Sequence, residues 1–380
     1  MEAGQALNAK VFFLLVLALM CFGFLMVFSA TSVDVRGHFG DTHFVVRQLI
    51  WGAVALAALA GAMLVPQKWL RRGAPALFAA SVVLLALVLV LGTELNHAKR
   101  WFRFGPVGVQ PSEIAKVAMI LYLAWLLAGP ATGKRRRLRT FLHAAAAIGV
   151  VSALILVEPD FGCAFFVAGW AFLVLLVGGI RWYYLAGSAA LGLPAAVWLV
   201  MSSPRHMSRI MIFRNPWADP QGAGHQLIQS LIALGSGGVR GAGLGLGQQR
   251  LSFLPEASTD FIFAVIGEQL GVVGTGAVLV LFGLLLFFGA RIIAAARNRF
   301  LYLVGFGALS MLVAQAAANI AVVTGSIPTK GIALPFLSFG GSGLVWAGTA
   351  AGMILNMARS AAPAPAVSRA RSIAGETAPA

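Results

Sequence analysis

Apolar stretches of roughly 20 residues recur along the whole chain, separated by short polar or basic segments. A run of this length matches a helix that crosses the hydrocarbon core of a bilayer. An outer-membrane barrel would instead show short segments of alternating polarity, and none is visible. The pattern predicts an all-α polytopic membrane protein with ten transmembrane helices, at residues 11–32, 44–65, 74–91, 111–128, 141–157, 161–179, 182–201, 256–290, 300–324 and 332–357.

The polar segment between the seventh and eighth predicted helices, residues 202–255, is expected to be a long extracytoplasmic loop. The membrane domain is expected to cover residues 1–358. Residues 359–380 are rich in Ala and Pro and are expected to form a disordered cytoplasmic tail. No internal repeat is visible, which weakens the case for a transporter built from inverted halves.

Composition supports the membrane assignment, since 59% of the residues are hydrophobic and only 11% are charged. The net charge of +16 would suggest a nucleic-acid partner in a soluble protein. Here Lys and Arg concentrate in alternate connections, as the positive-inside rule requires, so no nucleic acid is expected and both termini are placed in the cytoplasm. Cys21 and Cys163 both lie in apolar runs, which argues against a disulfide or metal framework.

Some basic residues do not follow the positive-inside rule. With both termini in the cytoplasm, they lie on the extracytoplasmic side, together with most of the acidic residues. They are Lys99, Arg100, Arg103, Arg205, Arg209, Arg214, Arg240 and Arg250. Such a set favours an anionic ligand because guanidinium groups suit phosphate, although contact with lipid head groups explains any single Arg nearly as well. The glycine-rich segment 235–247 could be a flexible or closely packed loop, or a backbone anion nest.

One stretch carries the strongest functional signal, from Gln249 to Gly271. A helix is expected to start near Pro255, since proline favours the first turn. Glu256 and Asp260 would then lie one turn apart on the same helical face, near the mouth of a membrane-spanning helix. An ionisable residue at such a depth is costly and points to function. Asp260 is therefore the candidate catalytic group.

Three other stretches hold candidate site residues. Between Asn96 and Lys116, Glu113 and Lys116 can pair on one helical face, either structurally or as a substrate contact. Trp101 in the same stretch could be an interfacial anchor or a platform for a sugar ring or isoprenoid.

The second stretch is E-P-D-F-G, whose Asp160 could cap the sixth helix or coordinate a cation. In the third, residues 325–343, Pro and Gly residues break the helix at the outer membrane edge. Such a break is tolerated only where the backbone lines a cavity or is buried in protein. Lys330 lies in this third stretch.

These motifs, in this order, resemble the SEDS family of polytopic peptidoglycan glycosyltransferases. The resemblance covers nearly the whole chain to Met357, and P-E-A, T-D-F, I-G-E and P-T-K-G look more like the division branch, FtsW, than the elongation branch, RodA. The stretches that carry it are K-R-W with Q-P-S-E, E-P-D-F-G, N-P-W-A-D-P-Q-G-A-G-H-Q-L-I-Q-S, L-P-E-A-S-T-D-F-I-F-A-V-I-G-E-Q-L-G and P-T-K-G-I-A-L-P-F-L-S-F-G-G-S.

The resemblance implies polymerisation of lipid II outside the bacterial inner membrane, at the division septum, with Asp260 of T-D-F as the catalytic residue. It implies an FtsI-like class B penicillin-binding protein as partner, together with other divisome membrane proteins and membrane lipids. A divalent cation, Mg²⁺ or Mn²⁺, could take part, with Asp260 as a ligand, and no organic cofactor is expected. The candidate substrate-binding residues are Arg100, Trp101, Arg103, Glu113, Lys116, Arg250, Glu256, Thr259, Lys330 and Ser338.

The chain also departs from the family pattern. Near Asp260, Ser258 stands where a His is common, Ser252 where a Glu is frequent, and Gln269 in place of a second Glu. Elsewhere Cys163 replaces a frequent Thr, Phe339 a Tyr and Gly343 a Ser. Two other functions stay open: a flippase for the same lipid-linked precursor, and a non-catalytic scaffold that recruits a penicillin-binding protein.

Overall fold

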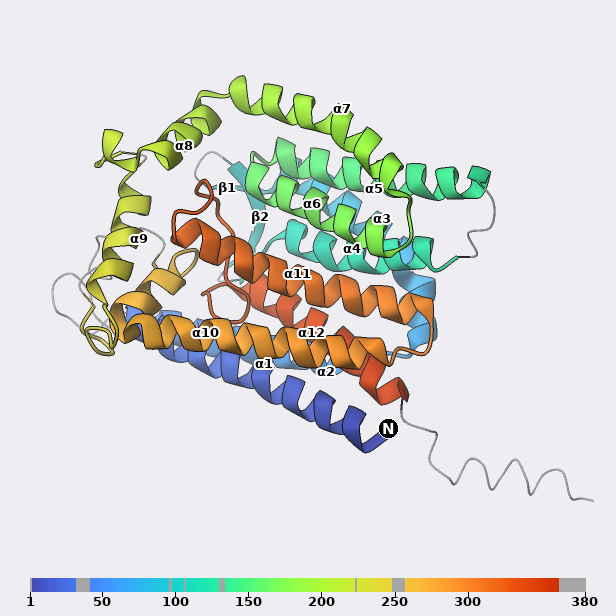
Figure 1. The fold of residues 1–380 in the computed structure, drawn as a ribbon, viewed down its shortest axis with the longest axis horizontal. Coiled ribbons are helices and arrows are strands. Elements are labelled where there is room, and N and C mark those ends of the chain that lie inside the picture. Colours follow the sequence, from blue (N-terminus) through green and yellow to red (C-terminus); the bar gives the residue numbers. More distant parts are fainter. Residues whose placement is uncertain are drawn as a thin grey trace, which may run out of the picture.

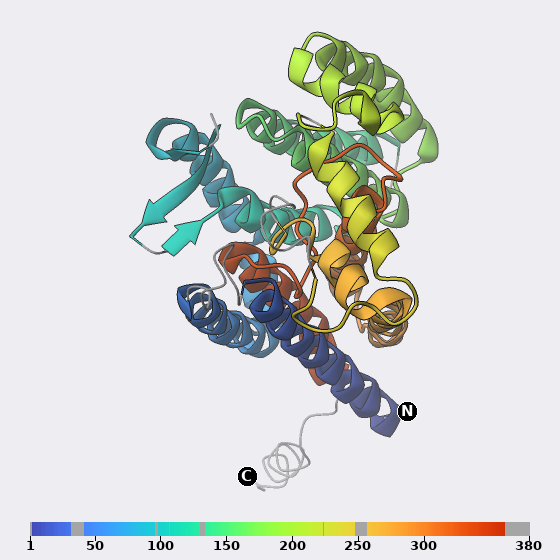
Figure 2. The same cartoon turned by 90° about the vertical axis from the view of Figure 1, so that its left-hand side faces the viewer.

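The computed structural model shows a bundle of long helices with a small sheet beside it (Figures 1 and 2). It describes residues 2–31, 42–95, 98–105, 107–129, 134–222, 224–247 and 257–361. A helix lies at each of the ten predicted positions: α1 (Glu2–Thr31), α2 (Thr42–Leu64), α3 (Gln67–Leu91), α4 (Pro111–Leu127), α5 (Lys134–Val157), α6 (Phe161–Val177), α7 (Trp182–Met201), α10 (Ile262–Ala294), α11 (Arg299–Val323) and α12 (Gly341–Ala361).

Seven of these helices are long and apolar enough to cross a membrane, within the part of the chain that the structure describes. They are α1, α2, α3, α5, α7, α10 and α11. α6 is apolar but has 17 residues. α12 starts at Gly341, nine residues later than expected, because the preceding segment with Pro335 forms an irregular loop.

Close helix packing depends on small residues, as is common in membrane bundles. α2 lies along α12, and α1 along α10. At the first contact Gly348 lies so near the carbonyl of Ala55 that a Cβ would come within 2.5 Å of its oxygen. Asn356 then donates from Nδ2 to three carbonyl groups at the end of α2, at 2.8 to 2.9 Å. These hydrogen bonds thus join α12 to the end of α2, beyond the apolar contact between the two helices.

The expectation of an all-α chain is wrong for the segment between α3 and α4. Three short strands form an antiparallel sheet with β2 in the middle: β1 (Thr93–Leu95), β2 (Ala98–Phe104) and β3 (Val107–Val109). The aromatic residues of W-F-R-F favour a strand, and Gly105, with φ of 60°, permits the turn into β3.

The segment expected to be a long loop is largely helical. It contains α8 (Pro204–Arg214), the single-turn η1 (Pro216–Ala218) and α9 (His225–Ser236). α7 lies at the outer edge of the bundle in both ribbon views (Figures 1 and 2), and none of its residues is buried, whereas α8 reaches the bundle where His206 packs on Phe161 of α6. α9 packs instead on the beginning of α10.

The glycine-rich segment after α9 packs against a break in α10. At Gly271, with φ of 64° and ψ of −157°, the helical conformation is interrupted. Backbone hydrogen bonds hold the segment to both sides of the break. Before it, Ala242 N donates to Glu268 O at 2.9 Å and Gly243 N to Gln269 O at 3.0 Å; after it, Val272 N donates to Gly238 O at 2.9 Å. Of the alternatives left open by the sequence, the structure shows the closely packed loop, since these amides are bonded to α10.

Gly241 provides a test of this contact. It has φ of 79°, and a Cβ would collide with the carbonyl oxygen of Gln269. Gly245 also has φ of 79°, but nothing lies within 4 Å of its Cβ position. We expect Gly241→Ala to destabilise the protein by about 2 kcal/mol more than Gly245→Ala, because only the first adds a collision to the backbone strain. Thermal unfolding in detergent measures the difference, and equal losses would contradict the packing.

Candidate functional site

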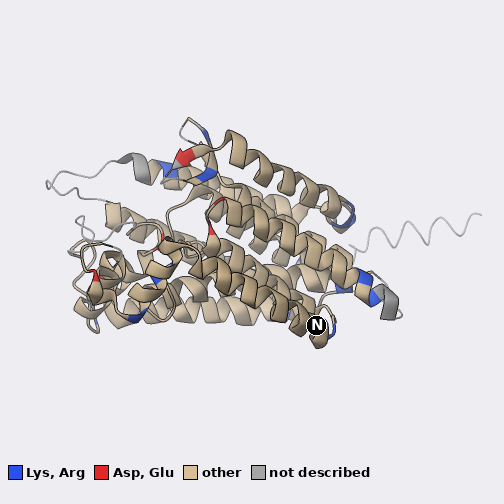
Figure 3. Ribbon diagram, turned by 90° about the horizontal axis from the view of Figure 1, so that it is seen from above, with Lys and Arg blue, Asp and Glu red and all other residues tan. Residues whose placement is uncertain are grey.

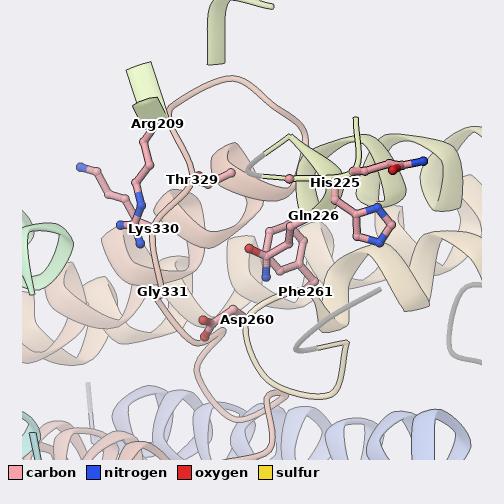
Figure 4. Close-up of a pocket in the computed structure, with 10 residues that line it drawn as sticks. Arg209, His225, Gln226, Asp260, Phe261, Thr329, Lys330 and Gly331 are labelled. Carbon is pink, nitrogen blue, oxygen red and sulfur yellow. The ribbon is translucent and has the colours of Figure 1, made fainter. Parts of the chain in front are cut away.

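A cavity of about 480 Å³ lies beside Asp260, where three segments that are far apart in the sequence meet (Figure 4). The segments are α8 with the connection into α9, the turn before α10, and the α11–α12 loop, residues 324–340. The lining residues are Arg209, Gln221, Gly222, His225, Gln226, Asp260, Phe261, Thr329, Lys330 and Gly331. Figure 4 shows Arg209 and Lys330 on one side of the cavity, His225 and Gln226 on the other, and Asp260 at its lower edge.

Asp260 lies in a turn before α10, so the expectation that it occupies a helix starting near Pro255 is wrong. The turn covers residues 257–261, and α10 begins at Ile262. Consecutive carbonyl groups of the turn accept hydrogen bonds from other segments. The bonds come from Phe339 N to Ser258 O at 2.8 Å, from Ser338 Oγ to Thr259 O at 2.6 Å, and from Asn319 Nδ2 to Asp260 O at 2.7 Å.

Asn319 joins the two walls of the cavity. Its side-chain amide donates to Asp260 O and to Ile332 O, each at 2.7 Å, and the residue is 1% exposed. The backbone of Gly331 lies beside the carboxylate, since a Cβ there would be 3.1 Å from Asp260 Oδ2. The amide therefore holds the Asp260 turn against the segment that carries Lys330.

Glu113 and Lys116 are not among the lining residues of the cavity. Lys116 Nζ lies 2.7 Å from Glu113 Oε2, 2.9 Å from Gln315 Oε1 and 4.6 Å from the ring centre of Trp346. Gln315 in turn donates to Ala333 O at 2.9 Å. Lys116 is buried and Glu113 partly buried, and the pair connects α4 to the α11–α12 loop, which is the structural alternative for these two residues.

Arg100 contacts the E-P-D turn between α5 and α6. It donates to Glu158 O at 2.7 Å and to Pro159 O at 2.6 Å, and it lies 3.6 Å from Asp160 Oδ2. Asp160 Oδ1 accepts from Cys163 N at 3.1 Å, which confirms that Asp160 caps α6. Arg100 thus ties β2 to the helical bundle.

The other candidate residues occupy different positions. Trp101 is half-buried in β2 and faces Gly108 of β3, while Arg103 is exposed in the same strand. Ser338 is buried and bonded to the backbone of Thr259. Arg250 and Glu256 lie outside the described residues.

Sequence reasoning did not single out His225, Gln221 and Gln226 as lining residues, and it placed Arg209 only among the outer cations. Gln221, His225 and Gln226 lie in the N-P-W-A-D-P-Q-G-A-G-H-Q stretch, whose polar residues in an apolar chain were the available signal, while Arg209 lies six residues before it in α8. Burial lowers the pKa of the Lys330 amine from its ordinary value.

Of the described lining residues, Asp260 alone carries a carboxylate. Magnesium is often held by one or two carboxylates together with the phosphates of a substrate. The residues therefore fit a cation that is shared with a phosphorylated ligand. Within the described ranges there is no group of three or more His, Cys, Asp or Glu side chains that would hold a metal without such a ligand.

The hydrogen bonds of Asn319 predict that its loss loosens the α11–α12 loop. Asn319→Ala removes the side-chain donor from the part-buried Asp260 carbonyl and from the buried Ile332 carbonyl, and the loss at the buried group costs about 1–3 kcal/mol. We expect faster amide hydrogen exchange in the α11–α12 loop. Asn298→Ala is a control at the other end of α11, where it removes a helix cap whose bond to Leu301 N is 2.9 Å long. Unchanged loop exchange in Asn319→Ala would contradict the assignment.

The burial of Glu158 predicts that the stability of the fold depends on pH. Glu158 is 1% exposed, and burial, with a smaller contribution from Asp160, raises its pKa from 4.5 to about 8. The folded state therefore binds a proton that the unfolded state releases, so stability should fall as the pH rises from about 5 to about 8. Glu158→Gln should flatten the dependence of the unfolding temperature on pH, whereas exposed Glu94→Gln should leave it unchanged. Parallel profiles for wild type and Glu158→Gln would refute this.

The family model of the FtsW, RodA and SpoVE cell cycle proteins matches residues 9–362. The probable peptidoglycan glycosyltransferase FtsW of Geobacter metallireducens is 39% identical over 354 residues, covering 91% of this chain and 93% of that protein. Stage V sporulation protein E of Bacillus subtilis is 38% identical over 353 residues, covering 91% and 95%.

Solved structures have the same fold. A chain in a peptidoglycan synthase complex that coordinates polymerization and crosslinking is 32% identical, with a TM-score of 0.77, and covers 93% of this chain and 98% of its own. The rod shape determining protein RodA of Thermus thermophilus is 28% identical, with a TM-score of 0.69, covering 93% and 97%. These matches confirm the SEDS resemblance, and the chain belongs to the FtsW/RodA/SpoVE family of cell cycle proteins.

Proposed function

We propose that this chain is a peptidoglycan glycosyltransferase that polymerises lipid II at the outer face of the cytoplasmic membrane, with Asp260 as general base. The observation that carries the proposal is the cavity in which Asp260 lies together with Lys330 and Arg209. Relatives named as probable peptidoglycan glycosyltransferases match over about nine-tenths of the chain and support the reaction class.

The proposed reaction joins two lipid-linked sugars. The 4-hydroxyl oxygen of one sugar forms a bond to the anomeric carbon of the other, and the bond from that carbon to the lipid diphosphate breaks. The diphosphate leaves with the electron pair, and the hydroxyl proton passes to the Asp260 carboxylate. General-base catalysis of this kind contributes about 10²–10⁴-fold to a rate.

The departing diphosphate needs positive charge, and the cavity offers two cations from different segments. Lys330 comes from the α11–α12 loop and Arg209 from α8. Charges fixed before the reaction stabilise the developing anion without reorganisation of solvent. If a Mg²⁺ or Mn²⁺ ion takes part, the carboxylate of Asp260 would hold it, and the ion would supply further positive charge.

Binding of the acceptor and donor sugars is assigned to the polar lining of the same cavity, above all His225, Gln226 and Gln221. Thr329 offers a hydroxyl on the opposite wall. Glu113, Lys116, Arg100 and Ser338 act indirectly in this proposal, because each holds a segment of the site in place.

The proposal also includes the membrane topology and the partner protein. All ten helices at the predicted positions would cross the membrane, with both termini in the cytoplasm and the Asp260 cavity outside. Figure 3 shows Asp and Glu toward the end of the bundle away from the N-terminus, which agrees with the expectation that most of the acids lie outside. A class B penicillin-binding protein would be the partner that crosslinks the product, and the similarity to FtsW relatives favours a role in division.

Asp260→Asn tests the assignment of the base. The substitution keeps the size of the side chain but removes its ability to accept the proton, so we expect polymerisation of labelled lipid II to fall at least about 100-fold. Glu94→Gln, which neutralises an exposed carboxylate of β1, should keep wild-type activity. The comparison requires that both variants unfold at the same temperature as the wild type. Wild-type turnover by Asp260→Asn would show that Asp260 is not the general base.

The same preparation separates the competing functions. Glycan chains from purified wild-type protein mean a polymerase. Movement of lipid II across sealed vesicles without glycan chains would mean a flippase, and the absence of both would mean a scaffold.

A further inference from the structure

A second, basic pocket lies at the opposite end of the bundle from Asp260. Asn319, near the end of α11, contacts Asp260, whereas Arg299, at the start of α11, lines this pocket. The intervening 20 residues of helix span about 30 Å. The pocket has a volume of about 220 Å³ and is lined by Leu127, Arg137, Thr140, Gly178, Gly179, Ile180 and Arg299.

The connection between α6 and α7 positions the guanidinium of Arg299. Arg299 donates to Gly178 O at 2.6 Å, and the structure gives it no other partner among the described residues. Gly179 has φ of 80°, and a Cβ there would lie 3.3 Å from the Arg299 guanidinium. Since a guanidinium carries five N–H groups, most of its donors remain available to a ligand at the pocket.

Arg137 supplies a second guanidinium from α5. It is half-buried, and Thr140 lies three residues later on the same helical face. Within the described ranges no carboxylate forms an ion pair with Arg137 or Arg299. Two cations that line one small pocket without an acidic partner favour the binding of an anion.

The remaining lining is apolar. Leu127 and Ile180 are buried, with exposed fractions of 2% and 6%. The pocket thus combines cationic donors with an apolar wall, at an end of the bundle where α5, α7 and α11 begin and α4 and α6 end. The basic residues around these helix ends place it at the cytoplasmic interface by the positive-inside rule, which is the depth of lipid phosphates.

We propose that this pocket binds the phosphate group of an anionic phospholipid from the cytoplasmic leaflet. Arg137 and Arg299 would hold the phosphate through charge-assisted hydrogen bonds, and the apolar wall would contact the adjoining glycerol and acyl carbons. The site is independent of the glycosyltransferase reaction, since its residues lie on the other side of the membrane in the proposed topology. A soluble phosphate would satisfy the same guanidinium groups but would make no use of the apolar wall.

Lipid retention by the full chain tests the proposal. The protein is purified in detergent, delipidated, and titrated with phosphatidylglycerol or with uncharged-headgroup phosphatidylcholine, and bound lipid is counted by native mass spectrometry. We expect wild type to prefer phosphatidylglycerol, and Arg137→Gln to weaken that binding about tenfold, the effect of losing one charge-assisted hydrogen bond. Arg139→Gln is the matched control, because Arg139 is exposed two residues away and does not line the pocket.

Arg137→Lys, which keeps the charge, serves as a milder variant and should retain more binding than Arg137→Gln. Inorganic phosphate distinguishes the source of the anion: if it binds in an Arg137-dependent manner while phosphatidylglycerol does not, the lipid assignment is overturned. Equal binding of both lipids by wild type, or equal losses in Arg137→Gln and Arg139→Gln, would overturn the site itself.

Discussion

The site depends on one interaction, the donation of hydrogen bonds by α11 and its following loop to the carbonyl groups of the Asp260 turn. Carbonyl groups that are not bonded within a helix must find donors elsewhere when water is excluded. Here the donors are Asn319, Ser338 and Phe339. The carboxylate is consequently held at the edge of a cavity by a segment about 60–80 residues away along the chain.

The short helical stretch after Asp260 is fixed on both sides. Residues 262–269 are all buried, and they include the polar Glu268 and Gln269 at the end of an otherwise apolar stretch. The Asp260 turn precedes this stretch, and the break at Gly271, clamped by the glycine-rich segment, follows it. Such a short helix cannot rotate without breaking hydrogen bonds at either end, which restricts the orientation of Asp260.

Two sets of basic residues serve different purposes in this arrangement. Lys330 and Arg209 line the Asp260 cavity, where the proposed reaction requires charge to meet a diphosphate. Arg137 and Arg299 lie at the other end of the bundle, where membrane topology already favours positive charge. Basic residues thus line pockets at both ends of the bundle, and in the proposals they meet a different anion at each end.

The sequence by itself predicted the helical membrane class, the approximate positions of ten of the helices and Asp260 as a candidate, because apolar runs and a charged residue at their edge are local signals. It did not reveal that Asp260 lies in a turn, that Arg209 and His225 share its cavity, or that Glu113 and Lys116 support the site through Gln315. Those facts depend on which carbonyl groups are satisfied by which distant donors, and on how closely glycines let backbones approach. Only the tertiary structure decides such pairings. A helix boundary or a cavity wall is set by contacts between distant segments, and the local sequence of one segment does not identify the segment that it contacts.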